Sequence, residues 1–181
     1  MKYKIITAAI VMLSIVNVIY AQEKNETVKL PVLTVEQKWE TAEGNLIYFV
    51  ISGISYAKSK GQTAEDFGVW AGKVGCPYWQ TLDSLTPAKF VQQISMNKQQ
   101  FKNFQMEILE AKKSSVKGRM KGFGNNLVTE YNLGGVTEDD YRRFFAKKWE
   151  TIAGCVKLVY TQKEEGEWTY FNVTKMDGIN K

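Results

Sequence analysis

The sequence has 181 residues, of which 44% are hydrophobic and 13% are aromatic, so a chain folded around a hydrophobic core is expected. Its net charge of +5 is modest and is not gathered in one basic patch, so the composition predicts no nucleic-acid partner. The sequence contains no histidine, which excludes Ser-His-Asp and Cys-His hydrolases, histidine-ligated haem and nearly all catalytic zinc sites. We therefore expect no metal and no cofactor.

Residues 1–21 have the layout of a secretory signal peptide. Lys2 and Lys4 precede a long apolar run, and Ala21 is a small residue at the point where cleavage is expected. Cleavage there would remove both lysines and lower the net charge from +5 to +3. A retained membrane anchor is the alternative, but the apolar run is short for a bilayer span. The sequence thus predicts a secreted or periplasmic protein with no stable membrane anchor after cleavage.

The rest of the sequence predicts one domain. Residues 22–33 are expected to form an extended lead-in, and residues 34–181 contain no linker or internal repeat. Thr34 followed by Gln37 is a capping-box pattern, and apolar residues then recur at three- and four-residue spacing. This pattern predicts a long core helix over about 34–60.

A second helix is predicted to begin after Thr63 and to end at Pro77. One side of it carries almost no side chains, since Ala64, Gly68, Ala71, Gly72 and Gly75 recur along it. Each interior glycine costs about 1 kcal/mol of helix propensity, so tolerating several indicates a close neighbour. That neighbour is expected to be another helix or a bound ligand.

A third helix is predicted to begin at Thr86-Pro87 and to continue to about Ala111, because Phe90, Ile94, Phe101, Phe104 and Ile108 recur at helical spacing. The pattern then changes to alternation. It predicts a strand over Val116–Gly122, a turn at Phe123–Asn126 and a return strand over Leu127–Leu133.

Thr137 is expected to cap a fourth helix that ends at Gly154. A second hairpin follows, with strands over Cys155–Gln162 and Glu167–Met176. Helices and hairpins are thus grouped rather than alternating. The predicted fold is α+β: three N-terminal helices, then a β-hairpin, a helix and a second β-hairpin, forming an antiparallel sheet covered by helices.

The two cysteines, Cys76 and Cys155, can pair in only one way. Their disulfide would close a loop worth roughly 4 kcal/mol in the chain-entropy model, and an exported protein resides where such bonds form. Two separate buried thiols are the alternative. We expect the disulfide.

Catalysis without histidine has two candidate sources in this sequence. Ser55-Tyr56-Ala57-Lys58 resembles the Ser-x-x-Lys motif of penicillin-recognising serine enzymes, and Ser95-Met96-Asn97 resembles their Ser-x-Asn element. Their third element, Lys-Thr-Gly, has no counterpart here. Carboxylate pairs are the other source, at Asp139-Asp140 and around Glu164, Glu165 and Glu167, but these positions are typical of a helix start and a solvated hairpin turn. We expect no catalytic residue.

Lys117, Arg119 and Lys121 alternate along the first predicted strand and form a basic stripe on one face. It either binds an anionic group or is an ordinary solvated face. Glycines on the opposite face, at Gly118 and Gly122, leave room for a large side chain or a bound molecule.

The favoured function is that of an exported non-catalytic protein that binds a small apolar or amphiphilic ligand between helices and sheet. Aromatic residues from helices and hairpins, together with glycines, favour such a pocket. The expected ligand-binding residues are Trp70, Gly72, Gly118, Met120, Tyr131, Trp149, Tyr160 and Tyr170. The alternatives are a protein–protein interaction module of the cell envelope or secretome, with a flat aromatic patch, and a histidine-free hydrolase.

Overall fold

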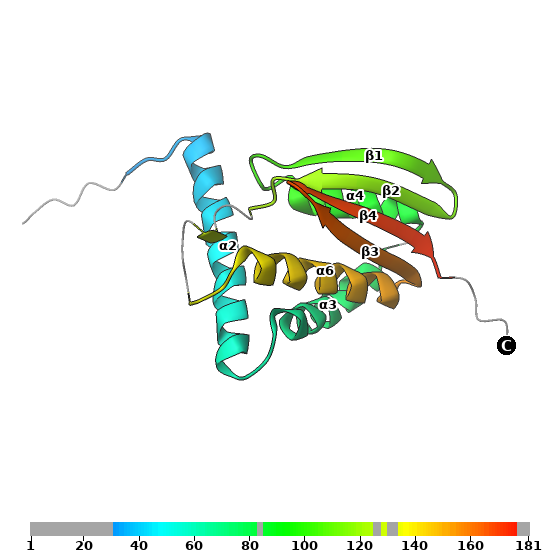
Figure 1. The fold of residues 1–181 in the computed structure, drawn as a ribbon. Helices are drawn as coiled ribbons and strands as arrows, with labels where there is room; N and C mark the ends of the chain where they lie inside the picture. The colour runs from blue at the N-terminus through cyan, green and yellow to red at the C-terminus, as the bar shows by residue number, and fades with distance from the viewer. Residues whose placement is uncertain (1–30, 83–84, 125–127, 130–133, 177–181) are drawn as a thin grey trace, which may run out of the picture. The chain divides into compact units, whose positions relative to one another are not determined.

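The computed structural model describes residues 31–82, 85–124, 128–129 and 134–176, and it confirms the predicted α+β fold (Figure 1). Its long helices are α2 (Val35–Ser59), α3 (Ala64–Gln80), α4 (Pro87–Lys98) and α6 (Glu138–Cys155). The strands are β1 (Gln105–Lys112), β2 (Ser115–Lys121), β3 (Leu158–Glu165) and β4 (Trp168–Lys175).

Threonine caps fix the starts of these helices where the sequence predicts them. The side chain of Thr34 accepts a hydrogen bond from the Gln37 backbone N–H, and the Gln37 side chain accepts one from the Thr34 N–H. Reciprocal capping boxes of the same kind begin α3 and α6. Such caps satisfy backbone donors that have no partner inside the helix.

The second helix does not end at Pro77, as the sequence predicts, but continues to Gln80. A proline removes one backbone hydrogen bond, to the carbonyl of the residue four positions earlier, here Lys73. Both residues are exposed, so water can satisfy that carbonyl. The extra turn places Trp79 in the core, and this packing outweighs the lost bond.

The predicted third helix is too long. Helix α4 ends at Lys98, turns follow at Phe101 and Phe104, and Gln105–Lys112 forms strand β1. The apolar spacing over Phe101, Phe104 and Ile108 imitates a helix, but it spans a turn and a strand. Pairing of β1 with β2 supplies hydrogen bonds that a longer helix would have supplied locally.

The predicted return strand over 127–133 is also wrong where it can be compared. Residues 128–129 are helical, and the rest of that segment lies outside the described residues. The partner of β2 in the first hairpin is instead β1, which precedes it. The second hairpin is confirmed, with β3 and β4 joined through a turn at Gly166.

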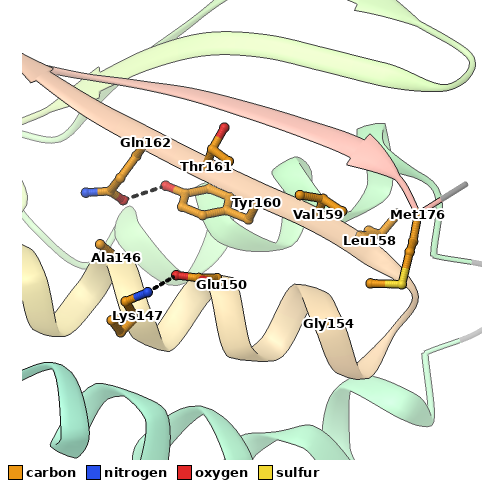
Figure 2. A pocket seen from close by; sticks show the side chains of 10 residues that line it. All are labelled: Ala146, Lys147, Glu150, Gly154, Leu158, Val159, Tyr160, Thr161, Gln162 and Met176. Atoms are coloured by element: carbon orange, nitrogen blue, oxygen red, sulfur yellow. Dashed lines mark hydrogen bonds and ion pairs between the residues drawn. The ribbon is translucent and has the colours of Figure 1, made fainter.

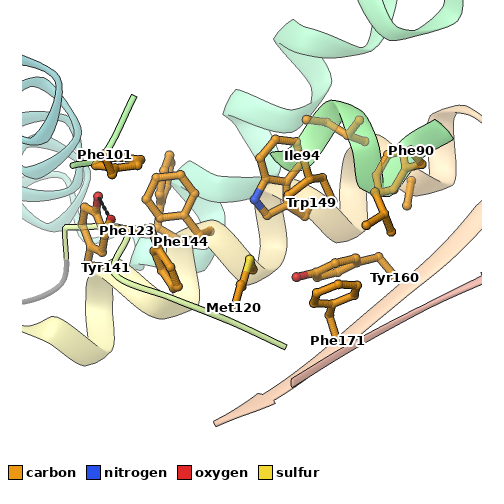
Figure 3. Close-up of a cluster of buried hydrophobic side chains, with 14 of the residues drawn as sticks. Phe90, Ile94, Phe101, Met120, Phe123, Tyr141, Phe144, Trp149, Tyr160 and Phe171 are labelled. Carbon is orange, nitrogen blue, oxygen red and sulfur yellow. Dashed lines mark hydrogen bonds between the residues drawn. The ribbon is translucent and has the colours of Figure 1, made fainter. Parts of the chain in front are cut away.

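The four strands form one antiparallel sheet in the order β1-β2-β4-β3. Helices α4 and α6 contact one face of it, and α3 packs along α6. Side chains of β4 alternate accordingly: Thr169, Phe171 and Val173 are buried, while Trp168 and Tyr170 lie on the other face. The buried aromatic and aliphatic side chains form one cluster between sheet and helices (Figure 3).

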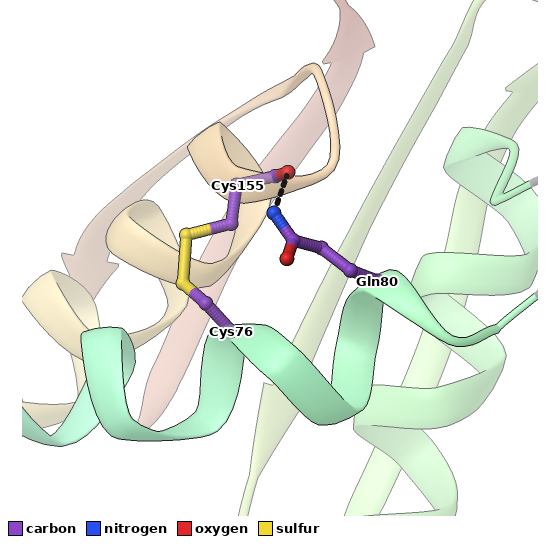
Figure 4. The surroundings of a disulfide bond; sticks show 3 residues. All are labelled: Cys76, Gln80 and Cys155. Atoms are coloured by element: carbon purple, nitrogen blue, oxygen red, sulfur yellow. Dashed lines mark hydrogen bonds between the residues drawn. A yellow bond between two sulfur atoms is a disulfide. The ribbon is translucent and has the colours of Figure 1, made fainter.

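The predicted disulfide between Cys76 and Cys155 is present, with Cα atoms 5.9 Å apart (Figure 4). Cys76 lies in the last turns of α3. Cys155 ends α6, where the sequence had predicted the start of a strand. The Gln80 side-chain amide donates a hydrogen bond to the Cys155 carbonyl beside it. The disulfide therefore joins the C-terminal parts of two packed helices.

Candidate functional site

Packed side chains fill the space in which the sequence predicts a ligand. Met120, Trp149 and Tyr160 are all buried, with relative exposures of 1%, 3% and 2%. Figure 3 shows these residues among the other core side chains, with Trp149 on α6 and Tyr160 on β3. These three residues belong to the hydrophobic core.

The two predicted glycines allow close packing. A Cβ atom at Gly72 would lie 2.6 Å from the Thr151 Cβ and 2.9 Å from the Lys148 carbonyl oxygen of α6. One at Gly118 would lie 2.5 Å from the Phe171 ring. These distances are too short for real contacts, so helix and ring occupy the volume that the glycines leave free.

The other predicted residues lie elsewhere. Trp70 is exposed on α3, and Tyr131 lies outside the described residues. Tyr170 is on the open face of the sheet, where its hydroxyl accepts a hydrogen bond from Arg119. Gly118 and Tyr170 both line a depression of about 310 Å³ on that face, but the eight predicted residues do not form one site.

A groove between α4 and β1 has the composition expected for an apolar ligand. It has a volume of about 280 Å³. Its walls are Ala88, Val91, Gln92 and Ser95 from α4, Met106, Ile108 and Ala111 from β1, and Val116 from β2. Ile108 is 49% exposed there, although it is a large aliphatic side chain. The groove could not be predicted from the sequence, because the apolar spacing up to Ala111 predicts a helix where the structure has strand β1.

A second groove runs between α6 and the other edge strand, β3 (Figure 2). Its volume is about 550 Å³, and charged and polar side chains line much of it. The Lys147 amine forms an ion pair with Glu150 at 2.7 Å. The Tyr160 hydroxyl donates a hydrogen bond to the Gln162 side chain. Because these polar side chains bond to one another, few of their hydrogen-bonding groups are left for a ligand.

The predicted basic stripe lies on the open face of the sheet, and carboxylates neutralise it. Lys117 pairs with Glu110, Arg119 with Glu107 and Lys121 with Glu167. In addition, Arg119 and Lys121 lie over the Trp168 ring, at 4.3 and 4.6 Å from its centroid. The stripe is thus part of a balanced network of ion pairs and cation–π contacts, which favours the solvated-face interpretation.

Lys98 carries a buried amine that no sequence pattern predicts. Its side chain is 1% exposed, and its Nζ atom has no hydrogen-bond partner among the described residues. Three aromatic rings surround it instead, those of Phe145, Phe123 and Phe101, with centroids 3.3, 4.4 and 5.1 Å away. Burial, reinforced by the charge of Lys148, lowers the pKa of Lys98 well below its usual value.

The Ser-x-x-Lys residues do not form a nucleophile–base pair. The Ser55 hydroxyl donates a hydrogen bond to the Gly134 carbonyl, and the Lys58 amine pairs with Asp140 at 2.7 Å. Burial works to raise the pKa of Asp140, but hydrogen bonds from Lys58 and Thr137 outweigh it and hold the pKa below its usual range. The ionised Asp140 carboxylate and the Lys58 amine thus form an ion pair that links α6 to α2.

The remaining carboxylates also have partners. Asp139 pairs with Arg143, Glu165 with Lys163 and Glu167 with Lys121, and Glu164 accepts a hydrogen bond from Thr169. In the part of the chain that the structure describes, no group of three or more Asp, Glu, Cys or His residues could hold a metal ion.

No protein-family model, curated protein or solved structure matches this chain. None of the helices within the described ranges is long and apolar enough to cross a membrane.

Proposed function

We propose that this chain is an exported, non-catalytic binding protein for a small apolar or amphiphilic molecule, which it holds in the groove between α4 and β1. The composition of that groove carries the proposal: Ala88, Val91, Met106, Ile108, Ala111 and Val116 give an apolar lining, and Gln92 and Ser95 give two polar groups. Ligand pockets commonly combine these features, with polar groups that orient an otherwise apolar ligand.

The position of the groove supports the same function. Strand β1 is at the edge of the sheet and pairs with β2 alone in the described sheet. A ligand could therefore enter from solvent without disturbing the core. It would cover the exposed part of Ile108, whose burial favours binding by about 25 cal/mol per Å². The export part of the proposal rests on residues 1–21.

Native mass spectrometry of the exported protein tests this function, together with a thermal-shift screen of fatty acids, sterols and aromatic metabolites. We expect a co-purified molecule or a stabilising compound. Ala88→Lys, which places an amine in the groove from an exposed position, should abolish that effect. Met96→Lys is the matched control, because Met96 is exposed on the same helix but does not line the groove.

Two results would count against the proposal. One is the absence of any co-purified molecule and of stabilisation by every compound class. The other is a stabilising compound that binds Ala88→Lys and the wild-type protein equally, because that compound would then bind elsewhere.

A further inference from the structure

Large apolar side chains of α2 and α3 are exposed to solvent. Their relative exposures lie between 59% and 71%. We call this set the α2–α3 aromatic surface; its members are Phe49, Tyr56, Trp70, Val74 and Tyr78. Single exposed apolar residues are common, but a continuous group of them marks an interaction surface.

Contacts link the two helices within this surface. The Trp70 ring stacks on Phe67, with centroids 5.6 Å apart and planes 13° apart. Phe67 in turn packs against Gly53 of α2, where a Cβ atom would lie 2.4 Å from the ring. Phe49 and Tyr56 flank Gly53 on the same side of α2, four residues before it and three after.

The α3 part of the surface is a stripe that points away from the core. Trp70, Val74 and Tyr78 are four residues apart, so they share one face of the helix. The opposite face is held tightly against α6, since a Cβ atom at Gly68 would lie 2.5 Å from the Phe144 carbonyl oxygen. The Cys76–Cys155 disulfide also fixes α3 to α6. The exposed side chains therefore cannot turn inward to become buried.

The charge around these residues is mostly positive, and the acidic residues of α3 are confined to its first turn, where Asp66 accepts hydrogen bonds from Thr63 and Glu65 pairs with Arg143. No Asp or Glu occurs between Asn45 and Lys60, or between Phe67 and Gln80. The lysines in these segments are Lys58, Lys60 and Lys73. Lys58 pairs with Asp140, whereas Lys60 lies over the Tyr56 ring at 5.5 Å and Lys73 is exposed on α3.

We propose that the α2–α3 aromatic surface binds reversibly to a lipid surface that carries anionic headgroups. Trp and Tyr rings favour the boundary between headgroups and acyl chains, because one part of each ring system is apolar and another is polar. Lysines at that depth are attracted to anionic headgroups. A surface with cations and aromatic rings, whose acidic residues are held at the start of α3, complements such a membrane better than it complements a protein interface of mixed charge. This surface is separate from the α4–β1 groove, so it is independent of the function proposed above.

Co-sedimentation with lipid vesicles tests the proposal, using protein recovered from an exporting host after its N-terminus has been determined. Vesicles of phosphatidylcholine alone are compared with vesicles that also contain phosphatidylglycerol. The bound fraction should rise with phosphatidylglycerol content and fall with added salt, because salt screens the attraction. Bound protein should also show a blue shift of tryptophan fluorescence, as Trp70 leaves water.

Matched variants locate the contact. Trp70→Ser should weaken vesicle binding about tenfold, since it removes the largest apolar side chain of the surface. Met96→Ser removes a similarly exposed apolar side chain from α4 and should leave binding unchanged. Lys73→Glu should reduce the dependence on phosphatidylglycerol, whereas Lys113→Glu, in the turn between β1 and β2, should not. Thermal unfolding should show that all four variants remain folded at the assay temperature, with a modest loss of stability in Trp70→Ser because its stacking on Phe67 is removed; this separates loss of binding from loss of the fold.

Three outcomes would overturn this proposal: no binding to vesicles of any composition, equal binding by Trp70→Ser and wild type, or binding that is independent of both phosphatidylglycerol and salt. If Trp70→Ser instead abolishes a complex with another protein while no vesicle binds, the surface is a protein interface.

Discussion

The Lys98 amine nitrogen lies 3.3 Å from the centroid of the Phe145 ring, with the Phe123 ring at 4.4 Å. Burial in such surroundings disfavours the charged form of an amine, and aromatic faces only partly replace the lost water. Lys98 therefore destabilises the fold at neutral pH relative to an apolar side chain of the same length.

Lys98→Met should raise the free energy of unfolding by about 1–4 kcal/mol, because it keeps the volume and removes the buried amine. Denaturation by urea at pH 7 measures this effect. Lys113→Met is the control, since Lys113 is exposed in a turn and its substitution should change stability by no more than about 0.5 kcal/mol. A destabilised Lys98→Met protein would mean that the amine has a partner in solution.

The same amine should make stability depend on pH. Burial lowers the pKa of Lys98 in the folded protein. At pH values between the pKa of Lys98 in the folded protein and its pKa in the unfolded chain, the unfolded chain therefore binds more protons than the folded protein. Stability of the wild type should then rise with pH across this window. Lys148, whose pKa is also lowered by burial, contributes a rise in the same direction.

The pH prediction is tested by subtracting the stability of Lys98→Met from that of the wild type at each pH from 7 to about 9.5. Lys148 is present in both proteins, so its own burial largely cancels in this difference. Buried Tyr141 and Tyr160 have raised pKa values, so the stability that they contribute is lost only above about pH 10. Parallel curves for the two proteins would rule out titration of Lys98.

Gly72→Ala should destabilise the protein by about 1–3 kcal/mol, although alanine favours a helix over glycine. The added methyl group would meet Thr151 and the Lys148 carbonyl of α6. Gly75→Ala is the matched control on the same helix. Its methyl group would lie 3.7 Å from Ile152, an ordinary contact, so it should stabilise by up to about 1 kcal/mol. Thermal or urea unfolding compares the two, and equal effects would show that α3 and α6 are packed more loosely.

Removal of the disulfide by a Cys76→Ser, Cys155→Ser double variant should lower the free energy of unfolding by about 2–5 kcal/mol. The bond closes a loop between residues that are 79 positions apart, so it restricts the unfolded chain. Reduced wild-type protein should match the double variant, while its unreduced mass should be two hydrogens lower than its reduced mass. Two free thiols in freshly exported protein would contradict the assignment.

Export should remove the first 21 residues. N-terminal sequencing of the secreted or periplasmic protein should begin at Gln22 or within a few residues of it. Protein that begins at Met1 and is recovered from membranes would instead support a retained anchor.

The sequence predicted the helix starts because each depends on a few neighbouring residues. Thr34, Thr63 and Thr137 act through side chains that bond to backbone groups three residues later, so the pattern is visible locally. Strand β1 was missed for the opposite reason. Its partner β2 decides its conformation, while the spacing of Phe101, Phe104 and Ile108 equally suits a helix.

The candidate site depends on the same non-local information. The groove between α4 and β1 exists only because Ile108 and Ala111 lie in a strand beside α4. Lys98 was missed because a lysine in the last turn of a helix is expected to be solvated and to favour the helix dipole. Neither its burial nor the three rings around it, which come from separate segments, can be inferred from the local pattern.

The strand order also constrains when the sheet can assemble during synthesis. Strand β4 lies between β2 and β3 in the sheet, and it pairs with β2 from Ser115–Thr174 onward although α6 and β3 separate the two strands in the sequence. In a chain that ends before Trp168, β2 and β3 therefore lack the strand that joins them. Such a nascent chain would expose an unpaired edge of β2 and could not complete its core. Late arrival of β4 would therefore delay completion of the sheet until nearly the whole chain has been made, a delay that would suit the export proposed above.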